Sequence, residues 1–187
     1  MTLTRLIPSL RLTLPDPLDI NLWPEATIAT VFDVVVSGVS LTHVAEICGT
    51  PCVYAGTAVV PGTGGQPAPA SSTRVVVFSV TRVSELSSNA TVIETDADFD
   101  DLRVVWSEMR LIRRASTART KVFLIARRPD VELARDADLA AVELPSDISA
   151  GDLVAVPTRP RATTPSSRDA TAHTRSSELP AWFSHLE

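Results

Sequence analysis

A chain of 187 residues with 44% hydrophobic residues is long enough for one domain, or for one domain and a tail. Its net charge of −5 is modest and no basic stripe is present, so we expect no nucleic-acid partner. No apolar run reaches the roughly 18 residues that span a membrane, so we expect no membrane partner. Pro8 and Pro15 interrupt the first residues, which predicts no signal peptide and a cytoplasmic protein.

The first third of the chain predicts short strands around one helix. Residues 1–27 are rich in proline and are expected to be irregular, with Trp23 and Pro24 anchoring them to the fold. Residues 27–36 predict one strand or two short ones. Residues 40–48 predict a short helix, because Ser40 can cap its first turn and Gly49 can end it. Residues 50–54 predict a brief buried strand.

Residues 58–73 (AVVPGTGGQPAPASST) have the composition of a loop or a linker, because glycine and proline alternate with small polar residues. Beyond this bridge, the β-patterned runs are residues 74–83, 91–95, 102–112, 121–126, 140–144 and 152–156. Short strands separated by turn residues are typical of a small antiparallel β-barrel or sandwich. We therefore predict a mainly β fold with one β-domain over residues 1–157.

The last thirty residues differ in composition from this domain. Residues 158–177 are rich in Pro, Ser, Thr and Arg, and predict a polar mobile tail. Residues 178–187 (ELPAWFSHLE) are more apolar and can form a short helix. Its face for docking a partner would comprise Trp182, Phe183 and Leu186.

Few residues suggest catalysis or metal binding. Cys48 and Cys52 lie four apart with His43 nearby, but a metal site needs more ligands at set spacings, so two reduced thiols are the better interpretation. His173 and His185 are in or beyond the polar tail, and no nucleophile elbow is present. We expect no activity from this chain alone.

Read in order, several segments resemble the diaminopimelate decarboxylase family, the fold-type III PLP-dependent amino-acid decarboxylases. These segments are LWPEAT…VVVSGVSLTHVAEICGTPCVY, VPGT in place of E-P-G-R, ATVIETDADFDDLRVVW, DVELARDADLAAVELPSDISAGDLVAVP and RSSELPAWFSHLE. The resemblance implies the β-domain of that family without its (β/α)₈ barrel, which needs about 200 to 250 residues. The bridge at residues 58–73 would replace the barrel.

The same resemblance implies that the chemistry of the family is absent from this chain. The barrel would carry the lysine that binds PLP, and Lys121, the one lysine, lies in a predicted strand where a solvated side chain is expected. The segment ARRPD has no cysteine at the family's catalytic position and keeps only Asp130, while Gly62 is a remnant of the cofactor loop. No cofactor is therefore expected on this chain by itself.

Four residues match, or stand in for, positions near the family's substrate. Arg103 occupies the position of an arginine that can hold a carboxylate bidentately, although a surface ion pair with Asp100 or Asp101 is the slightly favoured explanation. The other three are Asp96, Asp130 and Trp106, the last standing where the family has a tyrosine.

Three functions of different classes fit these observations. The first is a non-catalytic subunit or modulator that pairs with a PLP-dependent decarboxylase-like barrel protein and completes or caps its active site. The second is a binding module for small molecules or peptides, with Arg103 and Trp106 as contacts, and the third is a structural scaffold. A homodimer is compatible with each of them.

Overall fold

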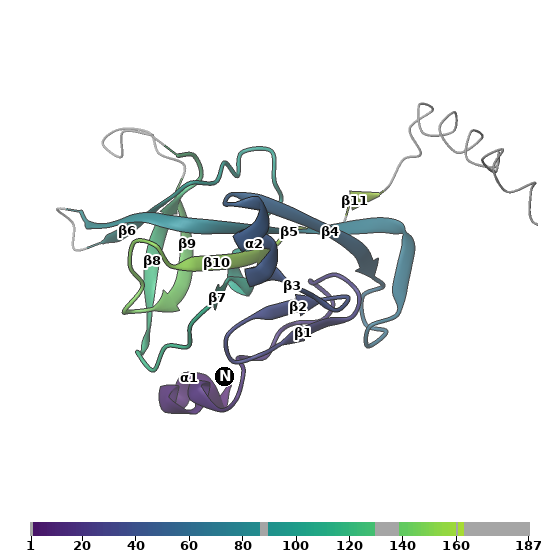
Figure 1. The fold of residues 1–187 in the computed structure, drawn as a ribbon, viewed down its shortest axis with the longest axis horizontal. Coiled ribbons are helices and arrows are strands. Elements are labelled where there is room, and N and C mark those ends of the chain that lie inside the picture. The colour runs from purple at the N-terminus through teal and green to yellow at the C-terminus, as the bar shows by residue number, and fades with distance from the viewer. Residues whose placement is uncertain (1, 87–89, 130–138, 160, 163–187) are drawn as a thin grey trace, which may run out of the picture.

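The computed structural model describes residues 2–86, 90–129, 139–159 and 161–162 (Figure 1). The protein is mainly β, as the sequence predicts, and most of its strands form one curled sheet with the shape of a half-barrel. A small antiparallel sheet lies beside it, made of β1 (Thr27–Ala29), β2 (Val34–Val36) and β3 (Val39–Ser40). The helices described are α1 (Leu3–Leu6), η1 (Pro8–Leu12), α2 (Leu41–Cys48) and η2 (Trp106–Glu108).

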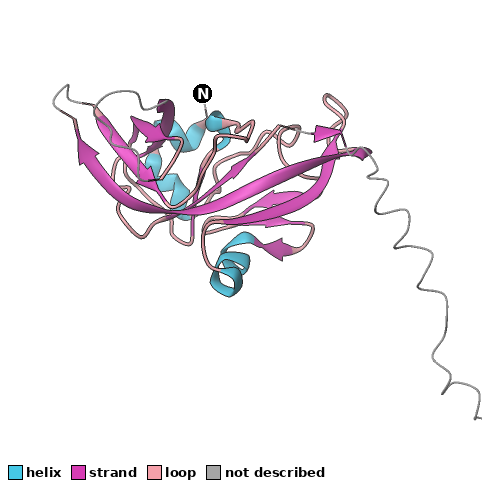
Figure 2. Ribbon diagram, turned by 90° about the horizontal axis from the view of Figure 1, so that it is seen from above, coloured by secondary structure: helices cyan, strands magenta, loops and turns pink. Residues whose placement is uncertain are grey.

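The large sheet is built around β5 (Pro67–Glu85), which curves through the whole molecule (Figure 2). The strand order is β7-β10-β5-β6-β8-β9, and β4 and β11 also pair with β5. The bounds of these strands are β4 (Cys52–Val59), β6 (Thr91–Thr95), β7 (Arg110–Ile112), β8 (Thr120–Ala126), β9 (Leu139–Pro145), β10 (Leu153–Pro157) and β11 (Arg161–Ala162).

One strand pair departs from the antiparallel arrangement that the sequence predicts. Strands β6 and β8 run parallel, with Val92 opposite Leu124 and Ile93 opposite Ile125. The segment between these strands is long enough to return the chain to the same end of the sheet, which a parallel pair requires. The sheet is therefore mixed.

Both faces of the middle of β5, residues 75–78, are buried, which explains the continuous apolar run there. Val76 and Phe78 belong to the core inside the half-barrel, whereas Val75 and Val77 belong to a second core with Trp23. Strand β10 divides its residues between the two cores in the same way. Successive side chains of a strand point to opposite faces, so a strand covered on both faces reads as an unbroken apolar run.

The prediction of a loop over residues 58–73 is wrong for most of its length. Residues 58–59 end β4 and residues 67–73 begin β5, with Ala58 opposite Ala68 and Val59 opposite Pro67. The two strands form a hairpin, and only residues 60–66 remain as its loop. Small and proline residues are tolerated here because the start of β5 is largely exposed, so little side-chain packing is required.

Two further predictions need correction. Residues 102–112 contain the three-residue strand β7, the short helix η2 and an isolated β-bridge between Val104 and Thr158, and no continuous strand along their length. Residues 1–27 contain two short helices where irregular chain is predicted. The polar tail at residues 158–177 and the docking helix at residues 178–187 lie largely or wholly outside the described residues.

The hairpin makes a clear prediction about insertions. A Gly-Ser insertion after Gly64 should change the free energy of unfolding by less than about 1 kcal/mol, because lengthening an exposed loop costs little closure entropy. The same insertion after Val75 should cost more, since it shifts the register of β5 against both β4 and β10. Urea unfolding of the two variants measures the difference, and equal losses would show that the loop is also part of the packed structure.

Candidate functional site: the N-terminal arm and the cavity beneath it

The first described residues form an arm, here residues 2–17, that crosses one side of the half-barrel (Figure 1). Helix α1 is only four residues long, and Pro8 starts η1, where its missing N–H is not needed. Figure 2 shows α1 and α2 on opposite sides of β5. The arm therefore covers a different face from the one that packs against α2.

The arm has polar residues inside and apolar residues outside. Thr4 and Arg11 are its buried residues, with exposed fractions of 4% and 6%. Leu3 is 65% exposed, and the same outward exposure is shared by Leu6, Ile7, Leu12 and Leu14. An amphipathic surface segment normally buries its leucines, so the arm is inverted relative to such a segment.

Polar contacts attach the arm to the half-barrel. Arg11 donates through Nη1 to the carbonyl oxygen of Ala118 at 2.9 Å, and its Nε is 3.1 Å from an oxygen of Asp16. Arg5 forms an ion pair with Glu143 on β9. Arg110 on β7 donates through Nη2 to the carbonyl oxygen of Pro17 at 2.8 Å. The arm is thus held by charged groups and backbone carbonyls rather than by apolar packing.

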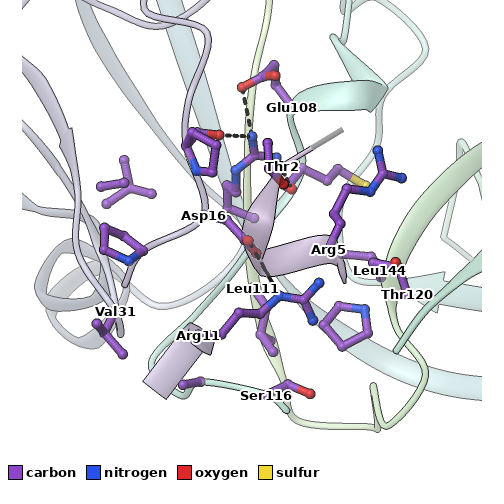
Figure 3. A pocket seen from close by; sticks show the side chains of 18 of the residues that line it. Thr2, Arg5, Arg11, Asp16, Val31, Glu108, Leu111, Ser116, Thr120 and Leu144 are labelled. Atoms are coloured by element: carbon purple, nitrogen blue, oxygen red, sulfur yellow. Dashed lines mark hydrogen bonds and ion pairs between the residues drawn. The ribbon is translucent and has the colours of Figure 1, made fainter. Parts of the chain in front are cut away.

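A cavity of about 260 Å³ lies under the arm (Figure 3). The arm, the β1–β2 turn, the η2–β7 segment and the ends of β8 and β9 contribute to its walls. The charged residues that line it are Arg5, Arg11, Arg110, Arg114, Asp16, Asp33, Glu108 and Glu143. Guanidinium groups and carboxylates are therefore present in equal number.

A buried network closes one side of the cavity. One carboxylate oxygen of Glu108, Oε2, accepts hydrogen bonds from Trp23 Nε1 at 2.9 Å, from Arg110 Nη2 at 3.1 Å and from the backbone N–H of Asp19 at 3.2 Å. Burial lowers the pKa of Arg110, an effect that the neighbouring Glu108 opposes but does not cancel. Like-charge repulsion from Arg5 acts in the same direction as burial. Within the described residues, the Nε–H of Arg110 has no acceptor.

The other carboxylates of the lining are engaged by their own partners. Asp33 accepts hydrogen bonds from the backbone N–H groups of Val34 and Thr42 and from the hydroxyls of Ser40 and Thr42. Asp16 contacts Arg11, and Glu143 contacts Arg5. The latter pair is the most exposed contact of the arm, with side chains 39% and 52% exposed.

Arg114 joins the rim of the cavity to the turn at residues 146–152. Its Nε and Nη2 each lie 2.6 Å from one oxygen of Asp152, and its Nη1 is 3.2 Å from Asp147. The hydrogen bonds that Arg114 donates to Asp152 raise the pKa of Arg114. Burial alone would raise the pKa of Asp152, but hydrogen bonds from Arg114 and Ser149 lower it below its ordinary value.

The residues predicted from the family resemblance lie away from this cavity. Asp96 binds the backbone of Ser79, accepting from its N–H at 2.9 Å, and Arg103 is an exposed residue before η2. Trp106 packs on the inner core, with its ring 5.1 Å from that of Phe99 and under the guanidinium of Arg127. Gly62 lies in the hairpin loop, with its N–H donating to Asn21. Asp130, Trp182, Phe183 and Leu186 are outside the described residues.

The sequence contained only a weak signal for the cavity. Glu108 and Arg110 are two residues apart and so fall on one side of an extended segment, but this spacing is common. Arg5 and Arg11 gave no signal. Arg5 pairs with Glu143 on a strand far along the chain, and Arg11 donates to a backbone carbonyl that any residue could supply.

Other candidates from the sequence have ordinary environments. Cys48 and Cys52 are free thiols, and burial, with Cys48 and Asp96 nearby, raises the pKa of Cys52, which disfavours its reactive thiolate. Lys121 is exposed on β8 and donates to Thr91. His43 is an exposed residue of α2. Among the described residues, no group of three or more His, Cys, Asp and Glu side chains is placed to hold a metal ion.

No protein-family model matches the chain, and no curated protein matches it. Among the described helices, none combines the length and apolar character needed to cross a membrane.

Proposed function

We propose that this chain is a non-catalytic β-domain that pairs with a second protein through the outer face of its N-terminal arm. The observation that supports this is the inversion of the arm, with five large apolar side chains exposed on one short segment. Burying a leucine or isoleucine side chain in an interface contributes about 1.5–3 kcal/mol, before the costs of association. Apolar side chains of this kind are what the centre of a protein interface buries.

The partner that we propose is a PLP-dependent decarboxylase-like barrel protein. The proposal rests on the order of the sequence segments that resemble the β-domain of that family, and a mainly β half-barrel is compatible with it. In such a pair the partner would bind PLP, and this chain would complete or cap its active site without supplying a catalytic group. The proposal places both proteins in the cytoplasm.

The test is a pull-down from the native host with the full chain as bait, followed by mass spectrometry and an absorbance scan. A barrel protein in the eluate, with the absorbance of protein-bound PLP at about 420 nm, would support the proposal. A second copy of this chain as the only partner, or the chain alone, would contradict it.

A matched pair of variants links the partner to the arm. Leu6→Lys and Ile47→Lys each place one positive charge at an exposed apolar residue in the last turn of a helix, α1 and α2 respectively. We expect Leu6→Lys to lower recovery of the partner at least about tenfold, as for loss of one buried apolar contact, and Ile47→Lys to leave it unchanged. Equal recovery with both variants would show that the arm is not the interface.

A further inference from the structure

We infer that the cavity under the arm binds a small oxyanion, a carboxylate or a phosphate, between the guanidinium groups of Arg5 and Arg110. This inference is independent of the pairing proposed above. It depends on three observations: the charged residues that line the cavity, the hydrogen bonds that Arg110 makes, and the exposed ion pair between Arg5 and Glu143.

The donors for an oxyanion are already present. A guanidinium carries five N–H groups in a planar fork that matches the oxygens of a carboxylate or a phosphate. Arg110 uses Nη1 and Nη2 toward Met109, Pro17 and Glu108, and its Nε–H has no acceptor among the described residues. A buried donor without an acceptor costs free energy, and an incoming oxygen atom would recover it once the side chains that cover Nε move aside.

Two positively charged groups in one cavity also favour an anion. Arg5 and Arg110 both line the cavity, and the repulsion between them contributes to the lowered pKa of Arg110. A negative charge between them would remove this repulsion.

The carboxylates of the lining do not prevent this. Asp33 accepts four hydrogen bonds, Glu108 accepts three through one oxygen, and Asp16 pairs with Arg11. Glu143 competes directly, because it pairs with Arg5, but its side chain is half exposed and can turn into solvent. An entering anion would therefore replace Glu143 as the partner of Arg5.

The size and walls of the cavity restrict the ligand. A volume of about 260 Å³ lies below the usual range for drug-sized ligands, so the ligand is a small metabolite. Val31, Met109 and Leu111 add apolar surface beside the charged groups. An anionic head with a short apolar part fits this composition.

Isothermal titration calorimetry on the purified full chain, at constant ionic strength, tests the inference with two probes, inorganic phosphate and butyrate. We expect a saturable heat of binding from at least one probe. The stronger of the two distinguishes a phosphate from a carboxylate ligand. Absence of a saturable heat with both probes would overturn the inference.

Two variants separate anion binding from attachment of the arm. Arg5→Gln and Glu143→Gln both break the same ion pair, but only the first removes a guanidinium. We expect Arg5→Gln to weaken binding at least about tenfold and Glu143→Gln to preserve or tighten it. Arg82→Gln, an exposed arginine of β5 paired with Glu94 and outside the lining, should have no effect.

Two patterns among the variants would contradict the inference. Equal weakening in Arg5→Gln and Glu143→Gln would show that the probe responds to the position of the arm and not to the charge of Arg5. An Arg82→Gln effect as large as that of Arg5→Gln would show that the anion binds the protein nonspecifically.

Discussion

Replacing Trp23 by alanine should lower the free energy of unfolding by about 4 kcal/mol, as large-to-small changes of buried aromatic residues do. Trp23 has no exposed surface and packs in the second core against β2, α2 and β5. Its indole N–H also donates to Glu108, which would lose one of its three hydrogen bonds. Urea unfolding monitored by circular dichroism measures the change.

Trp23→Phe is the matched control for this prediction. The phenyl ring retains most of the buried apolar area and removes the N–H donor, so the expected loss is smaller, about 1–2 kcal/mol. Glu108 keeps its contacts with Arg110 and Asp19 in this variant. A loss below about 1 kcal/mol for Trp23→Ala would show that the second core contributes little to global stability.

Replacing Asp152 by asparagine should cost about 2 kcal/mol at neutral pH, less than for a fully buried ion pair because Arg114 is 34% exposed. Asp152 accepts both hydrogen bonds of the Arg114 fork and one from the backbone N–H of Ser149. Asparagine cannot accept on both sides of its amide, and it leaves the guanidinium without its closest counter-charge.

The pH dependence of this pair follows from the lowered pKa of Asp152. A carboxyl with a pKa lower in the folded than in the unfolded state contributes its stability in full above the unfolded value of about 3.9. This contribution is lost as the pH falls through the folded value. The difference in stability between the wild type and Asp152→Asn should therefore shrink as the pH falls below about 4.

Asp147→Asn is the control for the ion pair between Arg114 and Asp152. Asp147 also contacts Arg114, but its side chain is 45% exposed, so we expect a loss below about 1 kcal/mol. Chemical unfolding at several pH values between neutrality and the acid limit measures both variants. Equal losses for Asp147→Asn and Asp152→Asn, or a difference that does not shrink in acid, would contradict the role given to the buried carboxylate.

Local sequence signals were sufficient for the helix α2. Ser40 caps it, since its hydroxyl accepts from the backbone N–H of His43 at 3.0 Å, and Gly49 ends it with a φ of +75°. Both signals act within a few residues and do not depend on the rest of the fold. The buried residues of the helix are Leu41 and Ala45, and Cys48 at its end is exposed.

The hairpin of β4 and β5 shows where composition misleads. Glycine and proline are frequent across residues 58–73, and composition alone treats the whole stretch as one loop. After the loop, the first residues of β5 form hydrogen bonds with β4. All eight residues of β4 pair with β5. Backbone pairing of an exposed strand needs no particular side chain, so composition carries little signal for it.

The sequence by itself determined the mainly β class, the helix at residues 40–48, the anchoring role of Trp23 and the strands β6, β8, β9 and β10, because periodicity, caps and turns are local properties. Only the tertiary structure decided the inverted arm and the cavity. Arg11 and Ala118, and Arg5 and Glu143, are each more than 100 residues apart, and each contact forms only when the half-barrel curls. The side of the arm that faces inward is set by its contacts with distant residues of the half-barrel, and the sequence pattern of the arm does not contain these residues. For that reason the pattern did not predict that five apolar side chains of the arm are exposed.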